Sequence, residues 1–237
     1  MEQKKQFRWQ NDLGRRVVSG ALAFLLSVSL LPSSLFAIDY DGDASPLQEI
    51  QLAQNAEINS KLTYNTLYDG FYYGEETIQN SANRAVNTFV TKVDHAESTL
   101  AIVTGVPDNK TPLEAGKRQT VSAQANAARA AGQNVLGAVN ADFFYINDNS
   151  KIQPEGVCIK NGQKLTEYKA DTYFFGIKND GTPVIGDEAA FDSVSGELKE
   201  AVGGRHLLVQ NGEVQTNTDN EAHPRTAVGI TADNDVL

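Results

Sequence analysis

Two polar residues interrupt an apolar run in the stretch VLGAVNADFFYI, which begins at Val135. They are Asn140 and Asp142, and the two-residue period of a strand places both on one face. An amide and a carboxylate so arranged can hydrogen-bond a sugar, position a water molecule, or act as general acid or base. A second explanation is that Asp142 caps a local turn while Asn140 bonds to backbone groups. The spacing alone leaves both explanations open.

The stretch AHPRTAVGI holds a second candidate, Arg225, which follows Pro224. We expect an apolar strand here, whose alternation buries Arg225 or directs it into a cleft. Arginine suits a phosphate, because its guanidinium offers a planar fork of donors. His223 lies at the start of this strand, where a general acid could sit. The alternatives are a salt-bridged arginine at a strand end and an exposed loop histidine.

The remaining reactive residue types give weaker signals. Cys158 is the only cysteine, so an internal disulfide is excluded, and alternation in EGVCIKNG makes it a core-facing strand residue. His95 and His206 have no partner visible in the sequence, and we treat both as structural. The motifs of phosphate-binding loops, nucleophile elbows and zinc proteases are absent from the sequence.

We expect no cofactor, with one alternative left open. The stretch INDNS supplies Asn147, Asp148 and Asn149, and oxygen ligands in a loop suit a hard divalent cation such as calcium.

The elements that must position these residues are mostly strands. β-type segments dominate from Leu62 onward, and the Ala-rich stretch before Gly132 predicts a helix. Four turn signals follow apolar segments: Asn161-Gly162, Asp180-Gly181, Asn211-Gly212 and Asp233-Asn234. This succession of β-type segments and turns, with the predicted helix, indicates an α+β fold. We expect a mixed or antiparallel sheet built from successive hairpins with one or two packed helices. Because the sequence stops at DNDVL within the last hairpin, we expect a fold that is incomplete at its C-terminal end.

The N-terminus predicts an export signal over residues 1–37. A basic region precedes the uncharged stretch Val17–Leu31, and small residues lead to a cleavage point near Ala37. We therefore expect a secreted, extracellular or cell-surface protein. Residues 38–61 are expected to form a linker with a short helix over 46–60, and residues 62–237 the main domain.

The charge balance restricts the partners. The chain has a net charge of −10, and removal of residues 1–37, with five basic and two acidic residues, leaves 15 basic against 28 acidic residues, or −13. Such a surface argues against nucleic acid, and against a membrane except through the export signal. It leaves room for one arginine that binds a single phosphate.

Five segments, in order, resemble the phosphodiester glycosidase family, the family of N-acetylglucosamine-1-phosphodiester alpha-N-acetylglucosaminidase-like domains. They are AVNADFF, PEGVCIKNGQKL, YFFGIKNDGTPVIG, HLLVQNGEV and HPRTAVGI, which together span about residues 135–237. The resemblance implies an exported hydrolase that cleaves a sugar-1-phosphodiester, such as a glycosyl phosphate or cell-wall carbohydrate, to free sugar and phosphomonoester. A leaving phosphate already carries charge, so it needs less protonation than an alcohol.

By the same resemblance, Asn140, Asp142 and Arg225 form the catalytic pocket, with Arg225 holding the phosphodiester. Asp142 would act as acid or base, or bind a sugar hydroxyl. The further substrate-binding residues implied are Phe143, Phe144, Gly156, His223 and Thr226.

Two departures from the family pattern qualify this interpretation. Ala141 replaces a common glycine, and the family's later Asp-Gly-Gly-Gly-Ser segment does not occur in these residues. The alternatives are therefore a non-catalytic module that binds cell-envelope glycans and an inactive fragment of a larger surface protein.

Overall fold

The computed structural model describes the residues in the ranges 23–28, 49–50, 62–79, 85–97, 99–114, 116–145, 153–216 and 223–237. The chain divides into two compact units. The first comprises Met1–Val28 and Ala101–Ala227, and the second Ser29–Leu100 and Val228–Leu237. Within the described ranges, no helix combines the length and apolar character needed to cross a membrane.

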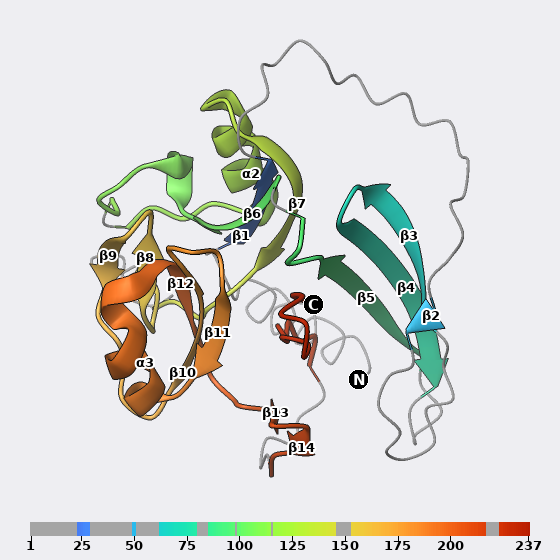
Figure 1. Cartoon of the computed structure of the whole chain (residues 1–237). Coiled ribbons are helices and arrows are strands. Elements are labelled where there is room, and N and C mark those ends of the chain that lie inside the picture. Colours follow the sequence, from blue (N-terminus) through green and yellow to red (C-terminus); the bar gives the residue numbers. More distant parts are fainter. Residues whose placement is uncertain are drawn as a thin grey trace, which may run out of the picture. The chain divides into compact units, whose positions relative to one another are not determined.

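The first unit contains a three-stranded sheet in the order β6-β1-β7, shown in Figure 1. Its strands are β6 (Leu100–Gly105), β1 (Ala23–Val28) and β7 (Asn134–Asn140). β1 pairs antiparallel with β7, and its residues come from the apolar stretch of the expected export signal.

Helix α2 (Val121–Ala130) packs against this sheet, where the sequence predicts a helix. The Thr120 side chain caps it by accepting the Ala123 N–H at 3.2 Å. Gly132 follows its end with φ +91°, a conformation that glycine adopts readily. The apolar contacts are made by Val103, Ala125, Ala128 and Val135. A 3₁₀ turn, η1 (Pro107–Asn109), precedes the helix.

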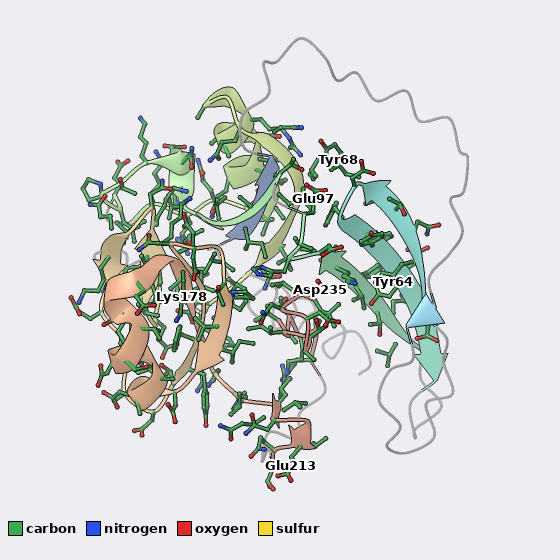
Figure 2. All side chains as sticks on the ribbon, in the orientation of Figure 1. Tyr64, Tyr68, Glu97, Lys178, Glu213 and Asp235 are labelled. Carbon is green, nitrogen blue, oxygen red and sulfur yellow. The ribbon has the colours of Figure 1, made fainter. Side chains whose placement is uncertain are left out.

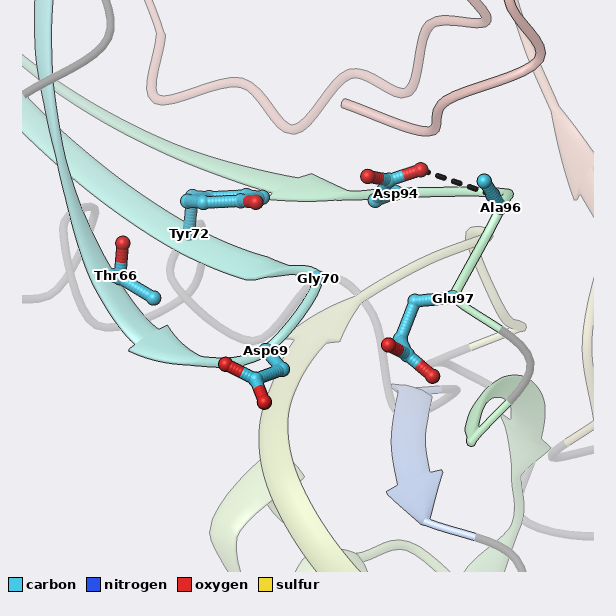
Figure 3. Close-up of a pocket in the computed structure, with 7 residues that line it drawn as sticks. All are labelled: Thr66, Asp69, Gly70, Tyr72, Asp94, Ala96 and Glu97. Carbon is cyan, nitrogen blue, oxygen red and sulfur yellow. Dashed lines mark hydrogen bonds between the residues drawn. The ribbon is translucent and has the colours of Figure 1, made fainter.

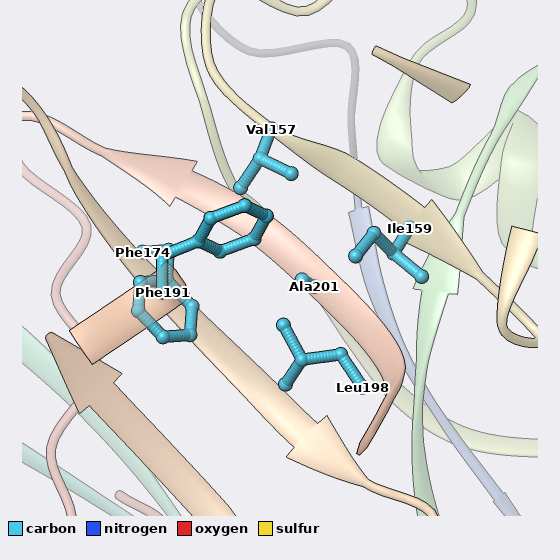
Figure 4. Close-up of a cluster of buried hydrophobic side chains, with 6 residues drawn as sticks. All are labelled: Val157, Ile159, Phe174, Phe191, Leu198 and Ala201. Atoms are coloured by element: carbon cyan, nitrogen blue, oxygen red, sulfur yellow. The ribbon is translucent and has the colours of Figure 1, made fainter. Parts of the chain in front are cut away.

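A five-stranded sheet forms the rest of the first unit, in the order β11-β10-β12-β8-β9. Its strands are β8 (Cys158–Lys160), β9 (Gln163–Thr166), β10 (Tyr173–Lys178), β11 (Pro183–Gly186) and β12 (Leu198–Gly204). Helix α3 (Glu188–Val194), followed by η3 (Ser195–Glu197), lies over it. Figure 4 shows the resulting core, made by Val157, Ile159, Phe174, Phe191, Leu198 and Ala201.

The turns between these strands confirm most of the sequence signals. Asn161-Gly162 connects β8 with β9, and Asn211-Gly212 connects β13 (Val209–Gln210) with β14 (Glu213–Val214), each with positive φ at both residues. Asp180-Gly181 was expected to form a two-residue turn of the same type, and this is wrong. Only Gly181 has positive φ, because the Asp180 carboxylate accepts the Thr182 N–H at 2.9 Å and supports a four-residue loop.

The second unit is built on an antiparallel sheet in the order β2-β3-β4-β5. Its strands are β2 (Glu49–Ile50), β3 (Leu62–Tyr68), β4 (Phe71–Gln79) and β5 (Ala85–Val93). β2 corrects the helix expected over 46–60, because Glu49 and Ile50 pair with β3 instead. The remainder of that expected helix lies outside the described residues.

The C-terminal segment, Val228–Leu237, belongs to the second unit. Val236 forms antiparallel bridges with both Val93 and Ile230, so the expected turn at Asp233-Asn234 is present. Asp235, labelled in Figure 2, lies 2.6 Å from the Lys92 ammonium, and its carboxylate accepts the His95 N–H at 3.1 Å. The α+β class is therefore confirmed, and every strand pair whose register is defined among the described residues is antiparallel.

A buried polar network holds β6 against the five-stranded sheet. The Glu200 carboxylate, only 1% exposed, accepts the Thr104 N–H at 2.9 Å and the Asn161 N–H at 3.1 Å. Lys160, also buried, donates to the Thr104 carbonyl at 2.5 Å. Burial raises the pKa of Glu200 and lowers that of Lys160. Glu200 thus satisfies two backbone donors, of which the Thr104 N–H is fully buried.

Replacing Glu200 by Ala is expected to cost about 3 to 5 kcal/mol of unfolding free energy. The change leaves the Thr104 and Asn161 N–H groups unbonded and Lys160 buried without an opposite charge. Urea unfolding measures the cost. Glu213→Ala, an exposed position on β14, serves as the control and should change stability little. Equal midpoints for the two variants would contradict the assignment.

Candidate functional site

The site is built where β7 ends. The strand stops at Asn140, and two residues later Asp142 turns inward, so that it is only 8% exposed. Its carboxylate is held by two backbone donors, because Oδ1 accepts the Phe143 N–H at 2.7 Å and Oδ2 accepts the Gly156 N–H at 2.6 Å. Asp142 therefore has a fixed orientation before any ligand arrives.

Two glycines make room for this carboxylate. A Cβ on Gly203 would lie 2.6 Å from Asp142 Oδ2 and 2.9 Å from Gly156 Cα. A Cβ on Gly156 would lie 2.9 Å from the same oxygen and 3.0 Å from Gly203 Cα. All four distances are below ordinary contact, so side chains at these two positions are incompatible with a buried Asp142.

Burial raises the pKa of Asp142 from 3.8 to about 6. The N–H groups of Gly156 and Phe143 oppose this rise by stabilising the charged form, while the nearby Glu155 charge adds to it. A carboxyl group with a pKa near 6 exchanges a proton readily close to neutral pH, which is the property required of a general acid or base.

The aromatic residues after Asp142 border the same region. The Phe143 carbonyl accepts the Glu155 N–H at 2.7 Å, and Phe144 forms a bridge with Pro154. Phe144 is half-buried and Phe143 is 43% exposed. Phe144 thus helps to connect residues 143–144 with residues 154–155, whereas part of Phe143 is accessible to a ligand.

Asn140 meets the second candidate stretch. Its Oδ1 accepts a hydrogen bond from the Thr226 hydroxyl at 2.9 Å. The apolar strand expected from residue 223 onward is wrong: residues 223–229 form no strand and His223 and Arg225 are exposed. Among the described residues, this segment has no strand partner before Gly229, which exchanges backbone hydrogen bonds with Leu237. Residues 223–228 therefore have no sheet face against which alternate side chains could be buried. The structure thus joins Thr226 to Asn140 directly, and Arg225 precedes Thr226 in the sequence.

Three charged residues near Asp142 were missed in the sequence. Glu155 and Lys169 form an ion pair beside it. Arg205 follows β12, and its guanidinium carbon lies 5.3 Å from the centre of the Phe143 ring. The signal for Arg205 was the preceding Gly203-Gly204 pair, since adjacent glycines in a strand mark a close approach of other atoms.

Cys158 and the other two histidines are not assigned to the site. Cys158 is fully buried, as alternation predicts, and burial raises its pKa further from neutrality. His95 and His206 are exposed. The calcium alternative at Asn147, Asp148 and Asn149 lies outside the described residues.

A separate pocket of about 310 Å³ lies in the second unit (Figure 3). Of its acidic residues Asp69, Asp94 and Glu97, the last two are engaged in local turns. Asp94 accepts the Ala96 N–H and Glu97 accepts the Thr99 N–H, each at 2.9 Å. These local turns form part of the pocket wall.

Comparison with known families identifies the region around Asp142. Residues 133–237 match the phosphodiester glycosidase family. This phosphodiester glycosidase segment, somewhat less than half of the chain, contains every residue placed at the site above and confirms the resemblance seen over residues 135–237. No curated protein matches the chain. The family implies glycosidase chemistry on a glycosyl phosphodiester.

Proposed function

We propose that the protein is an exported hydrolase that cleaves a sugar-1-phosphodiester to free sugar and a phosphomonoester. The observation that carries this proposal is Asp142: a buried, rigidly held carboxylate with a pKa of about 6, within the phosphodiester glycosidase segment. A hydrolase needs such a group to move a proton at the reacting bond.

In the proposed reaction, ionised Asp142 accepts a proton from a water molecule as the water oxygen bonds to the sugar C1. The bond between C1 and the bridging oxygen breaks, and its electron pair leaves with the phosphate. The phosphomonoester departs as an anion, so no acid is needed at the leaving oxygen. Asp142 then returns the proton to solvent.

The other residues bind the substrate. Asn140, whose Oδ1 is fixed by Thr226, presents its amide N–H₂ to a sugar hydroxyl. Phe143, which is 43% exposed, offers the part of its ring that Arg205 does not cover to the apolar side of the sugar. Arg225, on the same segment as Thr226, holds the phosphodiester with the N–H groups of its guanidinium.

The test is release of free N-acetylglucosamine from an N-acetylglucosamine 1-phosphodiester by the purified protein. Free sugar and phosphomonoester should appear in equal amounts, and Arg225→Ala should slow their release. No release by the parent protein, or an Arg225→Ala variant that behaves like the parent, would contradict the proposal. Retention on cell-wall material without turnover would favour a binding module instead.

Export is part of the same proposal, because the basic N-terminus and the uncharged stretch that follows it are typical of a signal peptide. When the chain is made in an exporting bacterial host, we expect the mature form outside the cytoplasm, beginning near Ile38. Mass spectrometry of the recovered protein measures this. A protein that keeps Met1 and remains inside the cell would argue against export.

A further inference from the structure

We propose that Arg205 is a phosphate-binding residue of this site and that it selects substrates carrying a phosphodiester. The inference rests on the proposed function for its substrate class. Arg205 comes two residues after Gly203, whose Cα faces the Asp142 carboxylate. The end of β12 therefore delivers a guanidinium group to the same region as the buried carboxylate.

The Phe143 ring orients that guanidinium. With the guanidinium carbon 5.3 Å from the ring centre, Arg205 is within the range of a cation–π interaction. Such a contact engages the guanidinium without using its N–H groups, which remain as hydrogen-bond donors. Among the ion pairs of the described residues, none joins Arg205 to a carboxylate. Its guanidinium is thus not committed to a carboxylate among the described residues.

The neighbouring charges favour an anion at this place. The pKa of Lys169 is raised, chiefly by its hydrogen bond to Glu155, and the positive charge of Arg205 opposes that rise. The two cations are therefore close enough to repel each other, while the Glu155 carboxylate is paired with Lys169. A phosphate beside Arg205 relieves this repulsion, in a chain whose overall charge is otherwise negative.

The chemistry of the leaving group gives Arg205 its role. A phosphodiester carries one negative charge, and the departing phosphomonoester gains more as the C1–O bond breaks. A planar fork of N–H donors binds two phosphate oxygens at once, and its attraction grows with that developing charge. A neutral glycoside offers no such partner. Arg205 therefore separates glycosyl phosphodiesters from ordinary glycosides.

The experiment measures equilibrium binding of phenyl phosphate, a phosphomonoester, and of free N-acetylglucosamine to four proteins: the parent, Arg205→Met, Arg205→Lys and Arg118→Met. Methionine keeps an apolar cover over Phe143 without the charge, and Arg118 is a matched exposed arginine elsewhere in the first unit. We expect Arg205→Met to weaken phenyl phosphate binding roughly 10- to 100-fold, because one or two charge-assisted hydrogen bonds are lost. Sugar affinity should change less than about twofold by the same reasoning. Arg205→Lys should be intermediate, and Arg118→Met should match the parent.

The inference is overturned if the parent does not bind phenyl phosphate, if Arg205→Met binds it as tightly as the parent, or if Arg118→Met shows the same loss. Turnover of the phosphodiester with phosphate binding independent of Arg205 would leave the proposed function standing and remove this inference. Phosphate binding that depends on Arg205, without any sugar release, would support this inference and contradict the proposed function. Thermal unfolding of each variant confirms that the fold is retained.

Discussion

Replacing Asp142 by Asn is expected to lower kcat/KM for a sugar-1-phosphodiester by roughly 10²- to 10⁴-fold, the usual contribution of a positioned general base. The amide cannot accept a proton from water at any pH near neutrality. Sugar release under single-turnover conditions measures the loss. The control is Asp171→Asn, an exposed aspartate whose φ of +59° asparagine also tolerates. Equal activities for the two variants would remove Asp142 from the mechanism.

This substitution also affects the fold, because both Asp142 oxygens accept backbone N–H groups and asparagine supplies one acceptor only. The parent protein therefore provides a second readout that needs no variant. Because ionised Asp142 is the active base, its kcat/KM should fall about tenfold per pH unit below a pKa of about 6 and level off above it. A kcat/KM that does not change between about pH 5 and about pH 8, an interval that includes this pKa, would exclude the base role.

The raised pKa also has a consequence for stability. Since the folded pKa of Asp142, about 6, exceeds its ordinary value of 3.8, the protonated form favours the folded state. That contribution is complete below about pH 4 and is lost as the pH rises through about 6. The unfolding free energy of the parent, measured relative to Asp142→Asn, should therefore decline over this interval.

Replacing Gly203 by Ala is expected to destabilise the first unit by about 3 kcal/mol and to remove most of the activity. The new Cβ would lie 2.6 Å from Asp142 Oδ2 and 2.9 Å from Gly156 Cα. Neither neighbour can move easily, since the carboxylate is held by two N–H groups and Gly156 Cα is backbone. Either Asp142 leaves its position or β12 moves away from the Gly156 segment.

The adjacent residue provides the matched control. At Gly204, a Cβ would have Tyr173 O as its nearest neighbour, at 3.8 Å, which is ordinary contact. Both glycines belong to β12, so Gly204→Ala makes the same chemical change in the same strand. We expect Gly203→Ala to unfold roughly 6–12 °C lower than Gly204→Ala, on the size scaling of thermal unfolding. Coincident melting curves with full activity in both would show that the close approach is not required.

The parts of the fold that depend on local rules were predictable from the sequence. The capped, Ala-rich helix α2 and the Asn-Gly turns follow from backbone preferences that neighbouring residues decide. The turn at Asp180 was not, because a side-chain hydrogen bond to Thr182 changed the loop type. The strand expected around Arg225 also failed, since alternation buries a residue only where a sheet face exists.

The candidate site was likewise predictable only in part. Asn140 and Asp142 were recognisable as polar residues in an apolar run, and Thr226 only through the family resemblance. Gly203 and Arg205 were missed, because what matters in each is a contact across the sequence: Gly203 with Asp142, and Arg205 with Phe143. The periodicity of a sequence indicates which face of a strand a residue occupies. It does not indicate which residue, distant in the sequence, that residue contacts.

The central claim is that water attacks the sugar C1, and not the phosphorus, when the phosphodiester is cleaved. Both routes give the same products, so hydrolysis in ¹⁸O-labelled water separates them. Attack at C1 leaves the phosphomonoester without label, because its bridging oxygen departs with the phosphate, and this is the predicted result. Mass spectrometry of the phosphomonoester provides the measurement. One labelled oxygen in every phosphomonoester formed would make the protein a phosphodiesterase and contradict the account.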